Sequence, residues 1–304
     1  MIRLGTRAST LALAQARSVA AGLEGEVEIV AMRTEGDRLA DARLAVVGGK
    51  GLFVREIEEA LMRREIDLAA HSLKDLPTET PPGLTLAAFP PREDPRDVLV
   101  ARAPVTVATL AMGARVGTSS PRRRALLLAL RPDLRVEPIR GNVDTRLRKL
   151  GAGDFDAIVL AAAGLRRLGL SPEHVERLDP DEFVPAVGQG IIAVEARADD
   201  AATLALAARI DDGVTRICAV AERAYLARLG ASCNTPMAAH ARLDGATVRM
   251  TAIVAGEDGR RVLRAAAAAP AVEAARLGRE LADALLARGA ADIVPLSPIG
   301  TSTR

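Results

Sequence analysis

Aromatic residues are scarce in this chain, which has four Phe, one Tyr and no Trp in 304 residues. Proteins that bind single-stranded nucleic acid stack bases on aromatic side chains, so a base-stacking surface is not expected. The formal net charge is only +2, without the strong positive field of most nucleic-acid-binding proteins. The composition therefore argues against a nucleic-acid partner, and the run Arg122-Arg123-Arg124 keeps that alternative open.

Cysteine is equally rare: Cys218 and Cys233 are too few for the disulfide framework of a small secreted protein. The residues after Met1 show a strand pattern and lack the apolar core of a signal peptide. The alanine-rich stretch 201–208 is too short to cross a bilayer. We therefore expect a cytoplasmic protein with no membrane partner. Metal-spaced Cys and His sets, a Walker loop and a Ser-His-Asp order are all missing from the sequence, so no metal site is expected.

Lysine is nearly absent as well, because only positions 50, 74 and 149 carry it among 41 basic residues. The other basic residues are arginines, which hold a carboxylate or phosphate with two parallel hydrogen bonds. Several arginines follow predicted strands, and ligands of open α/β sheets bind at the carboxyl ends of strands. The pattern predicts an anion site, with plain surface charge as the alternative for any single arginine.

Two stretches of the chain share one plan. Residues 2–10 predict a short strand over Ile2–Leu4, then a Gly-Thr turn, then a helix capped by Ser9 or Thr10. Residues 115–121 repeat this order, with Pro121 at the first helical position. We predict two similar α/β domains with largely parallel sheets, facing each other across a cleft.

The last third has a different pattern. It predicts a helix over 215–229, a β-hairpin over 237–255, a third strand over 261–267 and a final helix with leucines at 277, 281 and 285. These elements indicate a C-terminal α+β domain with a small antiparallel sheet.

A strand at 191–195 is expected to return to the first domain, and the glycine-rich stretch 34–51 is a candidate mobile loop. The predicted domains are 1–92 with 191–210, then 96–186, then 213–304.

Both Gly-Thr turns combine a helix N-terminus with arginines. Arg7 follows the first turn, and Arg122 and Arg123 follow the second. A helix N-terminus carries partial positive charge and binds anions, so the two copies together indicate a divided anion site. Ordinary helix capping remains the alternative for either turn alone.

Asp75 follows a predicted buried strand at 67–70. A carboxylate among many arginines is either a structural ion-pair partner or the one group meant for a cation, and the sequence leaves both open. His71 is expected to be an ordinary buried histidine. Cys233 falls in a predicted loop, where a thiol is reachable, and an ordinary loop cysteine is the alternative. Cys218 lies within a predicted helix and is expected in the core.

Taken together, these motifs resemble those of the porphobilinogen deaminase family, also called hydroxymethylbilane synthases. The matching stretches run in family order over most of the chain: 7–12, 49–53, 71–77, 92–97, 117–123, 140–146, 163–169 and 188–190. The match weakens in the last third, where Ala231 and Ser232 replace two glycines that usually precede the attachment cysteine. Glycine's freedom to adopt positive φ is lost there.

The resemblance implies a fold of two α/β domains like those of type II periplasmic binding proteins, plus the C-terminal domain. It implies a monomeric transferase that condenses four porphobilinogen molecules head to tail, with loss of ammonia, to hydroxymethylbilane for tetrapyrrole biosynthesis. A dipyrromethane primer, built from the same substrate, would be attached to Cys233 through a thioether. The implied partners are therefore small molecules: porphobilinogen and its oligomers.

The resemblance also implies roles for individual residues. Asp75 would be catalytic and would contact the cofactor. The other implied cofactor-binding residues, besides Cys233, are Lys74, Thr118, Ser120, Arg122, Arg123 and Arg140. The implied substrate-binding residues are Arg7, Ser9, Gln15, Ser119, Arg140, Arg146, Arg167 and Gln189.

These residue types suit the implied chemistry. Each pyrrole carries an acetate and a propionate, so a growing oligomer accumulates negative charge. Charge-assisted hydrogen bonds from arginines contribute about 1.5–3 kcal/mol each. Loss of ammonia leaves a cationic azafulvenium, which the carboxylate of Asp75 would stabilise.

The main alternative is a protein that binds an anion without catalysis. Two like α/β domains around a cleft also describe periplasmic-type solute receptors and effector-binding regulators. The expected absence of an export signal, the lack of a DNA-binding segment and the third domain with Cys233 argue against that alternative.

Overall fold

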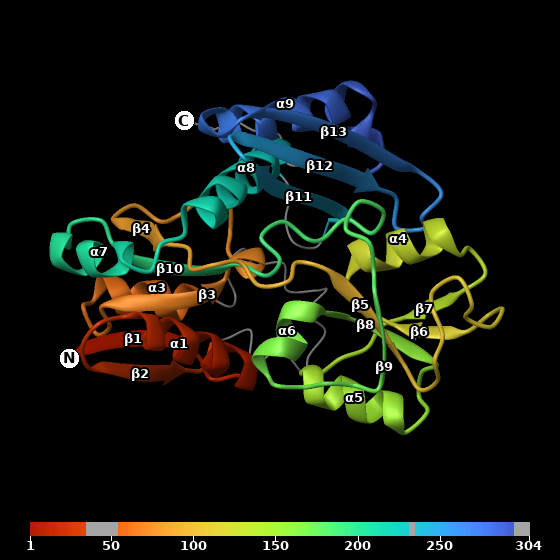
Figure 1. Ribbon diagram of the computed structural model, residues 1–304, viewed down its shortest axis with the longest axis horizontal. Helices are drawn as coiled ribbons and strands as arrows, with labels where there is room; N and C mark the ends of the chain where they lie inside the picture. Colours follow the sequence, from red (N-terminus) through yellow and green to blue (C-terminus); the bar gives the residue numbers. More distant parts are fainter. Residues whose placement is uncertain (35–53, 231–234, 295–304) are drawn as a thin grey trace. The chain divides into compact units, whose positions relative to one another are not determined.

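The computed structural model describes residues 1–34, 54–230 and 235–294 (Figure 1). Most of the predicted loop at 34–51, and Cys233 itself, lie outside these ranges. The chain forms two compact units, the first from residues 1–93 and 190–216 and the second from residues 94–189 and 217–304. No helix in the described ranges is long and apolar enough to cross a bilayer.

The first unit is built on a five-stranded sheet in the order β2-β1-β3-β10-β4. Its elements are β1 (Ile2–Arg7), α1 (Thr10–Gly22), β2 (Val27–Met32), α3 (Arg55–Met62), β3 (Leu68–Ser72), the 3-10 turn η2 (Leu73–Asp75), β4 (Leu84–Ala88), β10 (Ile192–Arg197) and α7 (Ala201–Ala208). The predicted return strand is therefore confirmed as β10. β10 runs antiparallel to both β3 and β4, so the other four strands share one direction, and the prediction of a largely parallel sheet is confirmed.

The second unit repeats this plan in a sheet of order β7-β6-β8-β5-β9. Its elements are β5 (Asp97–Ala101), β6 (Arg115–Gly117), α4 (Pro121–Leu130), β7 (Arg135–Glu137), α5 (Val143–Gly151), β8 (Ala157–Ala161), α6 (Ala162–Arg167) and β9 (His174–Arg177). Here β5 is the antiparallel strand in the fourth position. The two sheets thus share one strand order, and the predicted similarity of the α/β domains is confirmed.

The C-terminal part has the predicted α+β pattern. Its elements are α8 (Gly213–Leu229), the antiparallel strands β11 (Met237–Asp244), β12 (Thr247–Ala255) and β13 (Val262–Pro270), the 3-10 turns η3 (Ala271–Glu273) and η4 (Ala290–Asp292), and α9 (Ala274–Ala287). The leucines at 277, 281 and 285 are buried in one apolar cluster with Tyr225 of α8. Ala238 and Ile253 belong instead to the cluster of Leu127 and Phe183. The small sheet therefore shares a core with the α/β part of its unit, and the three-domain boundaries stay a prediction.

The two Gly-Thr pairs show where local sequence reasoning succeeds and where it fails. The predicted caps are confirmed: Ser9 accepts from Ala12 N, and Ser120, followed by Pro121, accepts from Arg123 N. The predicted turn at Gly5 is wrong, because β1 continues to Arg7. A Cβ on Gly5 would lie 2.3 Å from Cδ1 of Ile66, so glycine here serves a close approach within a strand rather than a turn.

Candidate functional site

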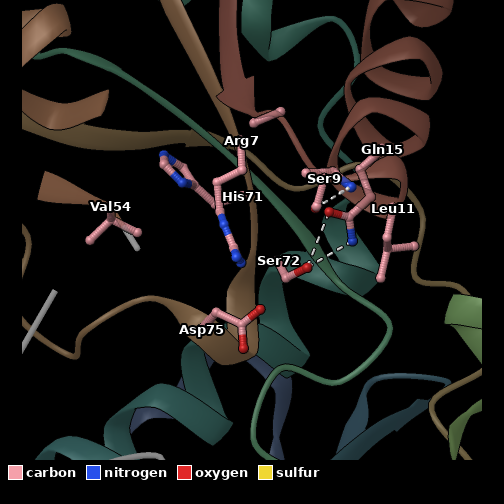
Figure 2. A pocket seen from close by; sticks show the side chains of 10 residues that line it. Arg7, Ser9, Leu11, Gln15, Val54, His71, Ser72 and Asp75 are labelled. Carbon is pink, nitrogen blue, oxygen red and sulfur yellow. Dashed lines mark hydrogen bonds between the residues drawn. The ribbon is translucent and has the colours of Figure 1, made fainter. Parts of the chain in front are cut away.

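The first unit has a pocket at the carboxyl ends of its parallel strands β1 and β3 (Figure 2). Its lining residues come from these strand ends, the start of α1, the turn η2 and the residue before α3: Arg7, Ser9, Leu11, Ala12, Gln15, Val54, Ala70, His71, Ser72 and Asp75. This is the sheet edge at which open α/β folds bind ligands. Four predicted residues, Arg7, Ser9, Gln15 and Asp75, are thus brought together.

Buried polar contacts hold the pocket wall in shape. Thr6 is fully buried, and its hydroxyl is within donating distance of two carbonyl oxygens, Ala70 O at 3.2 Å and Ala12 O at 3.3 Å. These contacts join β1 to β3 and α1. Gln15 Nε2 donates to Ser72 Oγ at 2.8 Å, and Ser72 Oγ lies 3.1 Å from Gln15 Oε1. The Gln15 amide therefore fixes Ser72, the residue before η2. Its predicted contact with substrate stays a prediction.

Asp75 is exposed but lines this pocket. Figure 2 shows the side chains of Arg7 and Asp75 pointing into the same space. Within the described ranges no residue hydrogen-bonds to the Asp75 carboxylate or forms an ion pair with it. Among the described residues Asp75 is therefore not a structural ion-pair partner, and its oxygens can accept from a ligand. Lys74 is half-buried on the same turn.

His71 is buried, as expected, with 5% of its surface exposed. Its Nε2 lies 3.2 Å from Oε2 of Glu195 on the neighbouring strand β10. Of these two residues, His71 lines the pocket. His71 thus belongs to the pocket wall, as a buried partner of a carboxylate.

The second unit contains a buried cluster of three charges. Asp97 at the start of β5 is fully buried, and it meets Arg122 and Arg123 from the first turn of α4. Its Oδ2 accepts from Arg122 Nη1 at 2.7 Å, and its Oδ1 accepts from Arg123 Nε at 2.9 Å. The same guanidiniums donate to Val184 O and Val159 O at 2.7 and 2.9 Å. These bonds fix both arginines rigidly.

The cluster carries more positive than negative charge. Burial alone would raise the pKa of Asp97, but the charges of Arg122 and Arg123 and their hydrogen bonds lower it to about 2. One carboxylate thus faces two guanidiniums. Burial and the nearby charge of Arg123 also lower the pKa of Arg146, whose Nε donates to Gly141 O at 2.8 Å. Arg122 Nε is buried without an acceptor in the described parts of the chain. A bound anion would offset this excess.

The predicted hydroxyl donors near this cluster already have contacts within the protein. Thr118 Oγ1 accepts from Ser120 N at 3.2 Å, Ser119 Oγ donates to Ile139 O at 2.7 Å, and Ser120 Oγ caps α4. Arg140 is exposed and Arg167 is half-buried, and both have partners of their own. Their roles as ligand contacts stay predictions.

Gln189 is also part of the Asp97 neighbourhood. With 1% of its surface exposed, it donates from Nε2 to Pro95 O at 2.7 Å and to Asp97 Oδ1 at 3.1 Å. Sequence reasoning placed Gln189 with the substrate and missed Asp97. Asp97 could have been found from its position at the end of the stretch 92–97. In a chain with so many arginines, an acidic residue there is a natural partner for a guanidinium.

Comparison with known proteins gives one consistent result. Residues 2–205 match the family model described as porphobilinogen deaminase, dipyromethane cofactor binding domain, and residues 216–287 match that of the C-terminal domain. The chain is 47% identical over 299 residues to a protein named porphobilinogen deaminase from Syntrophobacter fumaroxidans, with 97% of each chain covered. It is 52% identical over 291 residues to the one from Roseiflexus sp., with 94% of this chain and 96% of the relative covered.

Two of the solved structures similar to this chain are periplasmic binding proteins. One is the substrate-binding protein of an ABC transporter from Coxiella burnetii, with a TM-score of 0.39 and 18% identity, covering 69% of this chain and 92% of that one. Another is the aliphatic sulphonate binding protein from Escherichia coli, with the same TM-score and identity, covering 75% of this chain and 69% of that one.

Proposed function

Because this chain belongs to the porphobilinogen deaminase family, we propose how its residues divide the work of that family's reaction. The reaction condenses four porphobilinogen molecules, with loss of ammonia, to hydroxymethylbilane on a dipyrromethane cofactor. In our proposal the arginines of the second unit hold acidic side chains of the pyrroles, and Asp75 in the pocket of the first unit serves the chemical step.

The observation that carries this proposal is the excess positive charge around Asp97. Arg122 and Arg123 are both buried, and one carboxylate cannot neutralise both. The buried Nε of Arg122, without an acceptor in the described ranges, adds a donor for a ligand oxygen. Acetate and propionate groups of a dipyrromethane are carboxylates, which suit planar guanidinium donors. The residues present therefore fit this cofactor, and Arg146 and Arg140 would extend the binding surface.

Asp75 is proposed as the catalytic carboxylate. Departure of ammonia leaves a positive charge on the substrate pyrrole, and an arginine-rich site opposes that charge. An accessible carboxylate in the pocket can accept from a pyrrole N–H, stabilise the cation and take up a proton. Arg7, Ser9 and Gln15 border the same pocket and would orient substrate carboxylates and ring nitrogens. Lys74 on η2 would add a cationic donor.

Cys233 is proposed as the attachment residue, although it lies outside the described residues. A covalent thioether there would make every later addition intramolecular in effect, which lowers its entropic cost. Cys218, which does lie within the described residues, is buried in the core of the C-terminal part. We further propose a cytoplasmic monomer that needs no nucleic acid or membrane, divided at 1–92 with 191–210, 96–186 and 213–304.

One experiment separates this function from passive anion binding. The purified protein is weighed by intact-mass spectrometry, then incubated with porphobilinogen while ammonia and bilane formation are followed. We expect a mass increment of two pyrrole units and substrate turnover. A solute receptor would bind porphobilinogen reversibly, with neither a covalent increment nor ammonia release, and that result would refute the proposal.

A further inference from the structure

Glu222 of α8 is a fully buried carboxylate. Its Oε2 accepts from the backbone N–H of Gly188 at 2.7 Å, and its Oε1 accepts from the N–H of Ala241 on β11 at 2.8 Å. A buried carboxylate is costly unless it is hydrogen-bonded, so both contacts are expected to be strong. Glu222 thereby joins α8 to β11 and to the segment that contains Gly188.

The segment 184–189 is fastened at three points. Val184 O accepts from Arg122 Nη1 at 2.7 Å, Gly188 N donates to Glu222, and Gln189 Nε2 donates to Asp97 Oδ1 at 3.1 Å. Gly188 has a φ of +72°, a backbone conformation that favours glycine. The segment therefore has a defined shape, and two of its three attachments end on the Arg122–Asp97 pair.

We propose that Glu222 and Gln189 are positioning residues for the pair of guanidiniums of Arg122 and Arg123. Glu222 fixes Gly188, Gly188 places Gln189, and Gln189 orients the carboxylate that holds both arginines. The significance of this for catalysis rests on the proposed function, since the arginines matter to turnover only if they bind pyrrole carboxylates. Through Glu222, the helix that precedes Cys233 in the sequence is connected to the arginine pair within the second unit.

The chain offers a matched control for Glu222. Glu176 of β9 also accepts a backbone N–H with its carboxylate, from Val107 at 2.7 Å, and lies in the same unit. It has no hydrogen bond to Asp97, Arg122, Arg123 or the segment 184–189 in the described parts of the chain. Replacing either glutamate by glutamine removes a negative acceptor of a backbone N–H without changing side-chain size. Only Glu222→Gln is expected to disturb the arginines.

The direct test observes the arginines themselves. Protein labelled with ¹⁵N at arginine Nε gives one resonance for each slowly exchanging guanidinium, and Arg122→Lys and Arg123→Lys assign the two signals. We expect Glu222→Gln to shift or broaden both signals, Gln189→Met to do the same, and Glu176→Gln to leave them unchanged. Signals that stay in place in both Glu222→Gln and Gln189→Met, or that move equally in Glu176→Gln, would overturn the proposal.

Activity gives the second measurement. At an assay temperature well below the melting temperature of the variant, we expect Glu222→Gln to lower kcat about tenfold. Glu176→Gln is expected to lower only the stability of the protein. The Glu222→Gln and Gln189→Met effects should not add in the double variant, because both residues act through one chain of contacts. If the parent protein neither carries pyrroles nor turns over porphobilinogen, the proposed function fails, and the Nε signals still decide whether Glu222 positions the arginines.

Discussion

The carboxylate of Asp97 accepts a 2.7 Å hydrogen bond from Arg122 Nη1 in a place where both side chains are almost completely shielded from solvent. Breaking such a pair by removing one partner is costly, because the remaining charge stays buried without compensation. Here the loss would affect two guanidiniums at once, since Arg123 shares the same carboxylate. Asp97 therefore makes the buried charges of Arg122 and Arg123 compatible with a stable fold.

Asp97→Asn is expected to reduce the free energy of unfolding by about 3–5 kcal/mol at neutral pH. Urea denaturation measures this loss. The solvent-accessible pair of Arg131 and Asp133, also 2.7 Å long, is the control, and Asp133→Asn should cost far less than Asp97→Asn. Equal losses in the two variants would show that burial does not govern the strength of the Asp97 pair.

Acid should weaken the fold through the same residue. The pKa of Asp97 is lowered from 3.8 to about 2 in the folded protein by its two arginines, so the unfolded chain binds the proton first as the pH falls. The stabilisation is complete above the unfolded value and is lost as the pH falls through about 4 to about 2, a total of about 2 kcal/mol. Unfolding free energies across this range should fall more steeply for the parent than for Asp97→Asn, and parallel curves would contradict this.

Asp75→Ala should fold normally, because the side chain is exposed and no hydrogen bond within the described ranges depends on it. We expect kcat to fall by a factor of about 10²–10³, while the bound pyrrole mass remains. Steady-state kinetics together with intact mass separate the two effects. Glu65→Gln removes an exposed charge from the same unit and should leave kcat unchanged. Near-normal turnover of Asp75→Ala would remove this carboxylate from the mechanism.

Arg146→Leu should separate stability from function. Burial and the charge of Arg123 lower the pKa of the Arg146 guanidinium, so its positive charge is unfavourable in the folded protein. Replacement by leucine is expected to leave the melting temperature unchanged or to raise it, and to increase KM for porphobilinogen several-fold. Arg148→Leu on the same helix, an exposed position, is the control. A large loss of stability with an unchanged KM would make Arg146 a structural residue.

Features that depend on neighbours in the chain were predictable from the sequence. The caps at Ser9 and Ser120, Pro121 at the first helical position and the hairpin of the C-terminal part all follow from local hydrogen bonding and turn geometry. The similarity of the two α/β domains also followed from local motifs that recur, although the order of strands in their sheets did not. The same reasoning failed at Gly5, where a contact with Ile66 from a later segment decides between strand and turn.

The site was predictable only as a set of residue types. Arg122 and Arg123 were assigned to the ligand, but their common partner Asp97 lies 25 and 26 residues earlier in the chain. The contact of Gln189 with Asp97 spans 92 residues, and that of Glu222 with Gly188 spans 34. No periodicity or cap reports such pairings. They arise because β5 and the segment 184–189 are brought together by the fold.

Cys233→Ser should yield protein without a covalently bound pyrrole chain. The hydroxyl is a far weaker nucleophile than a thiolate, so the thioether cannot form and the primer has no anchor. Intact mass of the variant should equal that of the bare polypeptide, and turnover should be lost. Cys218→Ser is the matched control, because this cysteine is buried in the C-terminal core and should keep the two-pyrrole increment with some loss of stability. An increment that persists in Cys233→Ser and disappears in Cys218→Ser would transfer the attachment to the buried thiol, and would require the core around α8 to open during assembly.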